Sequence, residues 1–247
     1  MQLIQHGLAG LRPEISGFCS YFNRFRCIVL FTLLSLSPQL SAQEQGDWIM
    51  RMGAMGFSPD VGSSLLNSNS AGLIPGSGID LDSNTQFGLS LGYMLTDSWA
   101  VEAMTTAPFE HRLTVNGLEQ YGLTTSNLGE AMQVPPTLSV LHYFNSPSSR
   151  LRPYLGLGLN YTHFYDDSLS LQSRTEIGAE GLELDESFGV ALRAGVDWKL
   201  RAGWYLNASI WRYQLETNAS FNSNVGLIST DLTLDPWIYS ITLGHDF

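Results

Sequence analysis

The chain ends with the stretch WIYSITLGHDF, residues 237–247, in which large apolar residues occupy every second position. Alternation with a period of two is typical of a β-strand that has one apolar face. Chain ends usually fray, so an ordered final strand that closes on an aromatic residue, Phe247, needs a structural reason. One reason is a barrel, in which the last strand pairs with the first. The apolar face then points either into the core of a soluble barrel or outward into lipid.

The first part of the chain predicts a secretory signal peptide. Arg24 and Arg26 precede an apolar run that ends at Leu40, and the small residues Ser41 and Ala42 follow it. A basic flank, an apolar core of about 10 to 14 residues and a small-residue exit form the pattern of such a signal. The run is too short for a membrane-spanning helix, which needs about 20 apolar residues. The segment before the run is long for a signal peptide. A translation start downstream of Met1 would explain this length.

We therefore expect residues 1–42 to be removed and residues 43–247 to form a single domain. Both cysteines, Cys19 and Cys27, lie in the removed part, so the exported domain contains no thiol. Nine basic and 22 acidic residues remain, a formal charge of −13. That sign and the absence of a basic cluster disfavour nucleic-acid binding. Without an apolar segment of about 18 residues, the domain can span a membrane only as a barrel.

Eight alternating stretches can be identified in the exported domain, and they predict eight strands. They are residues 48–57, 85–95, 99–109, 135–144, 152–164, 187–200, 204–217 and 237–247. The connections between them are long and short in strict turn. An outer-membrane barrel has this asymmetry, with short periplasmic turns and long extracellular loops. The pattern predicts an all-β fold, an eight-stranded antiparallel up-and-down transmembrane barrel.

The two faces of the predicted strands agree with a membrane barrel. Large apolar residues alternate with Gly, Ala, Ser, Thr or Asn, and aromatic residues gather near strand ends, as the aromatic girdles of such barrels do. In a soluble barrel the small-residue face would meet water. Gly, Ala and Ser make a poor solvated face, and the domain contains a single lysine, Lys199.

The sequence resembles the OmpW family of outer-membrane proteins along nearly the whole exported domain. The matching motifs are GDWIMRMGA (46–54), GYMLTDSWAVE (92–102), APFEH (107–111), PPTL (135–138), RPYLGLGLNYTHF (152–164), GVDWKL (195–200) and LDPWIYSITLGHDF (234–247). The final residues, from Gly244 to Phe247, depart from the family's common Gly-Tyr-Arg/Lys-Phe ending. The resemblance implies location in the bacterial outer membrane and uptake of small hydrophobic molecules with sideways release into membrane lipid. It also implies that Phe247 is a signal to the outer-membrane insertion machinery.

Extending the alternation assigns the residues that face the lumen, which in an eight-stranded barrel is barely wider than its own side chains. Charged groups of both signs in so narrow a lumen should pair, and they predict an ionic plug formed by Arg51, Glu102, Arg193, Asp197 and Asp246. Apolar residues nearer the outer end predict a substrate path lined by Met55, Phe57, Met104, Pro108, Phe164 and Trp211. An apolar vestibule above an ionic plug would leave a lateral exit as the natural route.

Several alternatives stay open at this point. Pro135 and Pro136 predict a lateral opening in the wall, although proline at the start of a strand is ordinary. The ionic residues can serve stability alone, and the apolar ones can be packing without a ligand. The histidines show no metal-ligand spacing and no serine is linked to a base by a motif, so we expect no metal, no cofactor and no enzyme activity. The rival function is a closed structural or adhesive barrel without transport.

Overall fold

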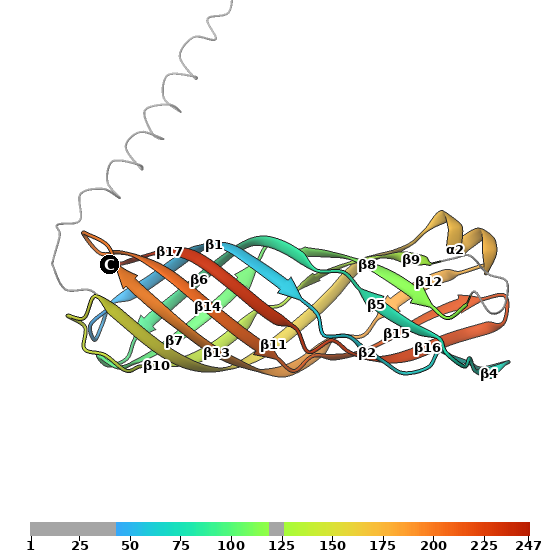
Figure 1. The fold of residues 1–247 in the computed structure, drawn as a ribbon, viewed down its shortest axis with the longest axis horizontal. Helices are drawn as coiled ribbons and strands as arrows, with labels where there is room; N and C mark the ends of the chain where they lie inside the picture. Colours follow the sequence, from blue (N-terminus) through green and yellow to red (C-terminus); the bar gives the residue numbers. More distant parts are fainter. Residues whose placement is uncertain (1–42, 119–125) are drawn as a thin grey trace, which may run out of the picture. The chain divides into compact units, whose positions relative to one another are not determined.

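A computed structural model describes residues 43–118 and 126–247, and eight of its strands form a closed antiparallel barrel (Figure 1). Each pairs with the next, and β1 pairs with β17 from Ile49 opposite Asp246 to Ser58 opposite Trp237. The predicted barrel is thus confirmed, strand by strand. The eight are β1 (Trp48–Ser58), β6 (Asn84–Met94), β7 (Trp99–Thr106), β10 (Thr137–Tyr143), β11 (Leu151–Leu169), β13 (Ser187–Lys199), β14 (Trp204–Tyr213) and β17 (Trp237–Asp246).

Short turns join the strands at one end of the barrel, here named the turn end, and long connections join them at the other, the loop end. The described chain begins and finishes at the turn end. There the backbone N–H of Trp48 donates to the carbonyl of Phe247 at 2.9 Å, and that of Phe247 donates to Trp48 at 3.0 Å. The terminal aromatic residue therefore takes part in the closing pair of strands.

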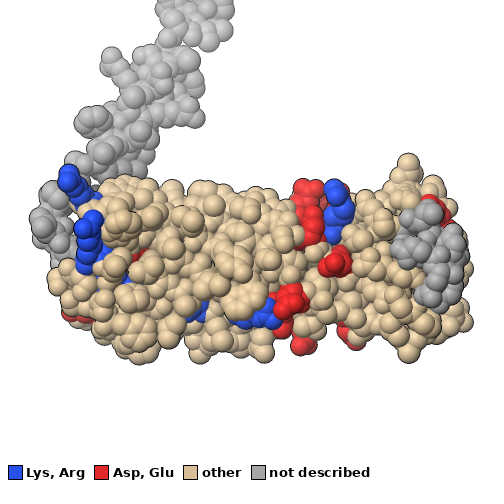
Figure 2. All heavy atoms as spheres, viewed as in Figure 1, with Lys and Arg blue, Asp and Glu red and all other residues tan. Residues whose placement is uncertain are grey.

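Burial alternates along every barrel strand, with large apolar side chains facing outward. Leu89, Leu157, Phe188 and Ile241 are among those exposed by 42% to 80% in the protein alone. The space-filling view shows this side of the barrel as a nearly uncharged band (Figure 2). Such a surface is unfavourable in water and suits lipid. None of the helices in residues 43–118 and 126–247 is long and apolar enough to cross a membrane.

The long connections are folded as well, which the sequence pattern did not predict. Their strands continue the wall beyond the barrel and enclose a second set of buried apolar side chains, here named the outer extension. Among the strands of residues 43–118 and 126–247, only β11 runs without interruption through both parts. The other elements of the outer extension are β2 (Gly62–Ser63), β3 (Asn67–Ser68), β4 (Gly72–Leu73), β5 (Gly78–Leu81), β8 (Phe109–Asn116), β9 (Asn127–Val134), α2 (Leu171–Glu176), β12 (Glu180–Leu184), β15 (Glu216–Ser223) and β16 (Gly226–Thr233).

Prolines and acidic residues mark the junctions between the barrel and the outer extension. Proline has no N–H for a ladder hydrogen bond and so ends or bends a strand. Carboxylates favour the level at which a membrane barrel leaves the hydrocarbon for water. Figure 2 shows the acidic atoms gathered in a belt at this level. The junction residues include Pro59, Asp60, Asp82, Pro108, Pro135, Pro136, Asp185, Glu186, Asp235 and Pro236.

Candidate functional site

Two arginines share one glutamate in the middle of the barrel. Arg51 on β1 and Arg193 on β13 each form an ion pair with Glu102 on β7. Nη2 of Arg51 also lies 2.8 Å from Oδ2 of Asp197 on β13. All four side chains are at most 3% exposed. Because the pairs reach across a lumen scarcely wider than its side chains, these four residues form the plug that the sequence predicted.

Side chains that the sequence analysis missed complete the plug toward the turn end. The Tyr143 hydroxyl lies 2.5 Å from Nη2 of Arg51, and Nδ2 of Asn207 donates to Asp197 at 2.6 Å. Arg152 is fully buried, with its guanidinium carbon 4.5 Å from the centre of the Tyr143 ring. Arg152 has the same strand parity as Phe164, so the alternation contained the signal that could have assigned it to the lumen.

An apolar layer lies directly on the loop-end side of the plug. The indole of Trp211 covers Arg193, whose guanidinium carbon is 4.2 Å from the ring centre. Phe57 and Phe109 pack with ring centres 5.4 Å apart. Met55, Phe57, Met104 and Trp211 therefore lie inside, as predicted, and form one buried cluster with Phe109, Ala191, Tyr213 and Ile238, here named the middle cluster.

His111 on β8 borders the middle cluster at the start of the outer extension. Its ring centre is 4.8 Å from that of Phe57, and its Nδ1 lies 2.9 Å from the carbonyl oxygen of Asp82. With the carbonyl as acceptor, Nδ1 is the protonated nitrogen. Burial lowers the pKa of His111, and its contacts with Asp82 oppose that shift without cancelling it. Burial therefore favours the neutral form of the ring.

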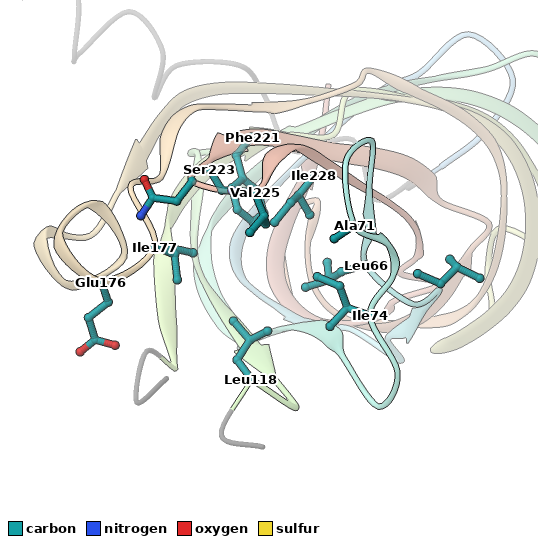
Figure 3. A pocket seen from close by; sticks show the side chains of 12 residues that line it. Leu66, Ala71, Ile74, Leu118, Glu176, Ile177, Phe221, Ser223, Val225 and Ile228 are labelled. Atoms are coloured by element: carbon teal, nitrogen blue, oxygen red, sulfur yellow. The ribbon is translucent and has the colours of Figure 1, made fainter. Parts of the chain in front are cut away.

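A pocket of about 370 Å³ opens in the outer extension, among side chains from the Leu66–Ile74 connection, the end of α2 and the β15–β16 hairpin (Figure 3). Its lining is apolar except for a few groups such as Glu176 and Asn224. Packed apolar side chains fill the extension between this pocket and the middle cluster. The lining residues are Leu66, Ala71, Leu73, Ile74, Leu118, Glu176, Ile177, Phe221, Ser223, Asn224, Val225 and Ile228.

Register pairing lapses at the junction with the outer extension on several seams, including the one between β7 and β10. These strands pair as far as Met104 opposite Thr137, and the next pair across the seam is Phe109 opposite Gln133, on β8 and β9. Residues 105–108 and 134–136 have no register partner across it, within the part of the chain that the structure describes. Proline on both edges removes N–H donors that would close the ladder. The interruption lies at the level of the middle cluster, to which Met104 and Phe109 belong.

Pro135 and Pro136, at which the sequence predicted a lateral opening, lie at this seam. Pro135 is buried and Pro136 is exposed. Next to them, the outer face of the barrel is hollowed by a cavity of about 550 Å³, whose lining includes Met104, Leu138 and Phe188. The seam therefore lies between the buried middle cluster and an apolar hollow on the lipid-facing surface.

Pro108 lies elsewhere than expected, and Phe164 and Asp246 lie apart from the other predicted site residues. Pro108 is exposed, so its assignment to the lumen is wrong: β7 ends at Thr106, the chain bends, and Phe109 takes the next buried position. Phe164 is buried, as assigned, and lies in the apolar core of the outer extension, outside the middle cluster. Asp246 lies at the turn end and contacts none of the four plug residues through an ion pair in the described part of the chain.

Comparisons with known proteins agree over nearly the whole described chain. A family model described as the OmpW family matches residues 44–247. Outer membrane protein W of Vibrio cholerae is 38% identical over 221 residues, which are 89% of this chain and 97% of that protein. The dibenzothiophene metabolism operon protein PahQ of Pseudomonas aeruginosa is 25% identical over 225 residues, 91% of this chain and 99% of that protein.

Solved structures show the same fold. The crystal structure of the outer membrane protein OprG from Pseudomonas aeruginosa matches with a TM-score of 0.78 and 34% identity, and covers 83% of this chain and 98% of that one. The solid-state NMR structure of the outer membrane protein AlkL in lipid bilayers matches with a TM-score of 0.59. At 19% identity over 86% of this chain and 95% of that one, it is a likeness of fold.

Proposed function

Because the chain belongs to the OmpW family of outer-membrane proteins, we propose that it takes up small hydrophobic molecules and releases them sideways into the outer membrane. The turn end then faces the periplasm and the outer extension faces the outside. The observation that carries the proposal is the interruption of the β7–β10 seam at the level of the middle cluster. An apolar interior meets an apolar outer surface at that one level.

The proposed route has three stages. A molecule enters the pocket lined by Leu66, Phe221 and Ile228 and passes along the buried apolar side chains of the outer extension to the middle cluster. Below it the ionic plug blocks the lumen, since a desolvated apolar molecule gains nothing by separating buried ion pairs. The remaining way out is the seam beside Met104. Methionine is unbranched and adaptable, so this side chain suits a passage that opens by rotamer change.

The name of one relative supports the substrate class. PahQ is named for a dibenzothiophene metabolism operon, and dibenzothiophene is a flat, apolar, sulfur-containing aromatic compound. A protein encoded with enzymes for such a compound would meet apolar solutes. For this chain the name supports small hydrophobic molecules as a class and does not select one of them.

The second candidate is a closed structural or adhesive barrel, favoured by the tight packing of the interior. The side chains of the middle cluster are at most 3% exposed, and they fill the route between the outer pocket and the seam. Such a barrel would need no interrupted seam. The experiment below separates the two functions.

Uptake of a radiolabelled small hydrocarbon by cells lacking the protein should rise when the protein is expressed. Replacing Pro135 and Pro136 together by alanine restores N–H donors at both positions. That of residue 136 lies on the β11 side, where the Pro136 carbonyl accepts from Tyr161, and that of residue 135 lies on the seam side, so we expect slower uptake at equal surface level. Replacing Met55 by arginine places a charge in the middle cluster and should abolish uptake.

Controls identify the seam as the cause. Pro59 lies at a junction on another strand, outside the seam, so Pro59→Ala should leave uptake unchanged. Val225→Asp places a charge in the outer pocket, whereas Leu171→Asp changes an exposed residue of α2 outside the pocket. Only the first of these two should slow uptake. Equal uptake with and without the protein, at confirmed surface expression, would favour the structural barrel.

A further inference from the structure

The first described residue, Gln43, is buried at the turn end of the barrel. Its side chain is 0% exposed, whereas Glu44 and Gln45 after it are exposed. Its backbone φ is +61°, in a region that residues other than glycine, asparagine and aspartate seldom occupy. A residue that precedes the first strand adopts such a conformation only where its contacts require it.

Every polar group of Gln43 has a partner in the plug region. Nε2 donates to Oδ2 of Asp197 at 2.7 Å, and the backbone nitrogen donates to Oδ2 of Asp246 at 2.9 Å. Nη1 of Arg152 donates both to the Gln43 carbonyl at 2.8 Å and to its Oε1 at 3.0 Å. Gln43 thereby joins Asp246, Asp197 and Arg152, three groups carried by three different strands.

Asp246 lacks the partner that a buried carboxylate needs. Its side chain is 7% exposed, its Oδ1 accepts no hydrogen bond, and no ion pair within residues 43–118 and 126–247 includes it. A single amide N–H is a weak partner for a desolvated carboxylate, because burial of an unpaired charge is costly. A cation with several hydrogens at the position of the Gln43 nitrogen would satisfy both carboxylate oxygens.

We propose that the chain is cut between Ala42 and Gln43 and that the new α-ammonium group of Gln43 pairs with Asp246, completing the plug from the periplasmic side. The cut is hydrolysis by an endopeptidase of the signal-peptidase type. One water adds across the bond: its oxygen stays on Ala42 as part of a carboxylate, and its two hydrogens end on the Gln43 nitrogen. The ammonium then has three hydrogens for Asp246 where the amide had one.

This inference is independent of the transport proposed above, since it concerns how the periplasmic mouth is closed. It also makes the ion pair a property of the processed chain only. N-terminal glutamine can lose its charge by cyclisation, in which the amine attacks the side-chain carbonyl carbon and ammonia leaves. Here the ammonium has no free electron pair and Nε2 is bound to Asp197. We therefore expect Gln43 to keep a free amine.

The first test is intact mass and N-terminal sequencing of the protein purified from outer membranes. We expect a chain that begins at Gln43 and has the full mass of residues 43–247. A start at another residue, or a mass lower by one ammonia, would overturn the proposal. Amine-directed reductive methylation of the folded protein should also modify Gln43 slowly, and Asp246→Asn should expose it.

The second test compares unfolding in detergent micelles. Asp246→Asn should raise the unfolding equilibrium constant roughly tenfold, the effect of a hydrogen bond to a charged group. Insertion of one glycine between Ala42 and Gln43 moves the ammonium away and should cost a similar factor. The two changes together should cost no more than either alone, because both remove the same pair.

The matched control is Gln43→Ala, which keeps the ammonium but removes the side-chain contacts with Asp197 and Arg152. Gln43→Ala should raise the unfolding equilibrium constant by nearly the same factor in the Asp246→Asn protein as in the parent. If Asp246→Asn costs as much in the glycine-insertion chain as in the parent, the ammonium is no partner of Asp246 and the inference fails. If the insertion chain does not fold, the methylation rate of Gln43 in Asp246→Asn tests the ion pair instead: a rate no faster than in the parent protein overturns the inference.

Discussion

The charged side chains of the plug depend on one another, and Glu102 is the carboxylate that two arginines share. It faces two guanidinium groups, those of Arg51 and Arg193, in a site from which water is excluded. Glu102→Gln leaves both cations without that carboxylate. We expect the free energy of unfolding to fall by about 3 to 5 kcal/mol. Urea unfolding in detergent micelles measures it.

The control for this prediction is an arginine–glutamate ion pair that is exposed to water. Nε of Arg112 lies 4.0 Å from Oε1 of Glu130, and both side chains are about half exposed. Glu130→Gln should cost less than about 1 kcal/mol. Equal losses for the two variants would show that burial adds nothing to the plug.

His111 gives the outer extension a dependence on pH. Because burial lowers its pKa, the unfolded chain binds a proton on this ring at a higher pH than the folded chain. Stability from this group is therefore complete above the unfolded pKa of about 6.5 and declines as pH falls below it toward the folded pKa. We expect NMR titration of the His111 ring to give a lower midpoint in the folded protein than in urea. An unchanged midpoint would contradict the burial argument.

At the residue scale, the sequence predicts the charged residues of the plug but not the polar side chains that contact them. Arg51, Glu102, Arg193 and Asp197 were found because a charge on an inward parity has to be paired. Tyr143 and Asn207 were missed because inward-facing tyrosine and asparagine also occur as packing. Gln43 lies before the first strand, where no alternation exists to assign a face.

At the scale of elements, the barrel strands were predictable because each must bury one face and expose the other over about ten residues. The strands of the outer extension were not. Several have only two to five residues, and others, such as β15 and β16, are rich in Asn, Ser and Thr and have no plainly apolar face. Some signal was present: Leu113 and Val115 alternate on β8, and both are fully buried. The seam was predictable only from its prolines, because lost pairing leaves no other trace in sequence.

The closing strand pair depends on a glycine. A Cβ at Gly53 on β1 would lie 2.3 Å from the carbonyl oxygen of Ile241 on β17, closer than real side chains approach. Gly53→Ala should therefore separate β1 from β17 locally and lower the temperature at which the barrel unfolds on heated gel electrophoresis. Gly62 has no atom within 3.7 Å of such a Cβ, so Gly62→Ala should leave that temperature unchanged. A similar loss for Gly53→Ala and Gly62→Ala would show that the effect does not depend on the space around the new Cβ.

At the scale of the whole described domain, two stacked parts have separate apolar cores. The barrel is stabilised by its closed ladder and by the plug, and the outer extension by its own buried side chains. Prolines interrupt the strands between them. We therefore expect amides of β15 and β16 to exchange with deuterium in water faster than those of β13 and β14. Exchange of all four strands at one rate would indicate a single cooperative unit.

The unbroken course of β11 has a mechanical consequence. Of the strands that the structure describes, it is the one that runs through both parts, from Leu151 to Leu169, with a bulge between Tyr165 and Ser168. A pull applied at the tip of the outer extension would reach the barrel along every chain crossing, and along β11 it would pass no break in strand structure. In force spectroscopy on membranes, the extension should unravel first, at low force, and a second, higher rupture should follow when the load reaches the pairing of β11 with β13.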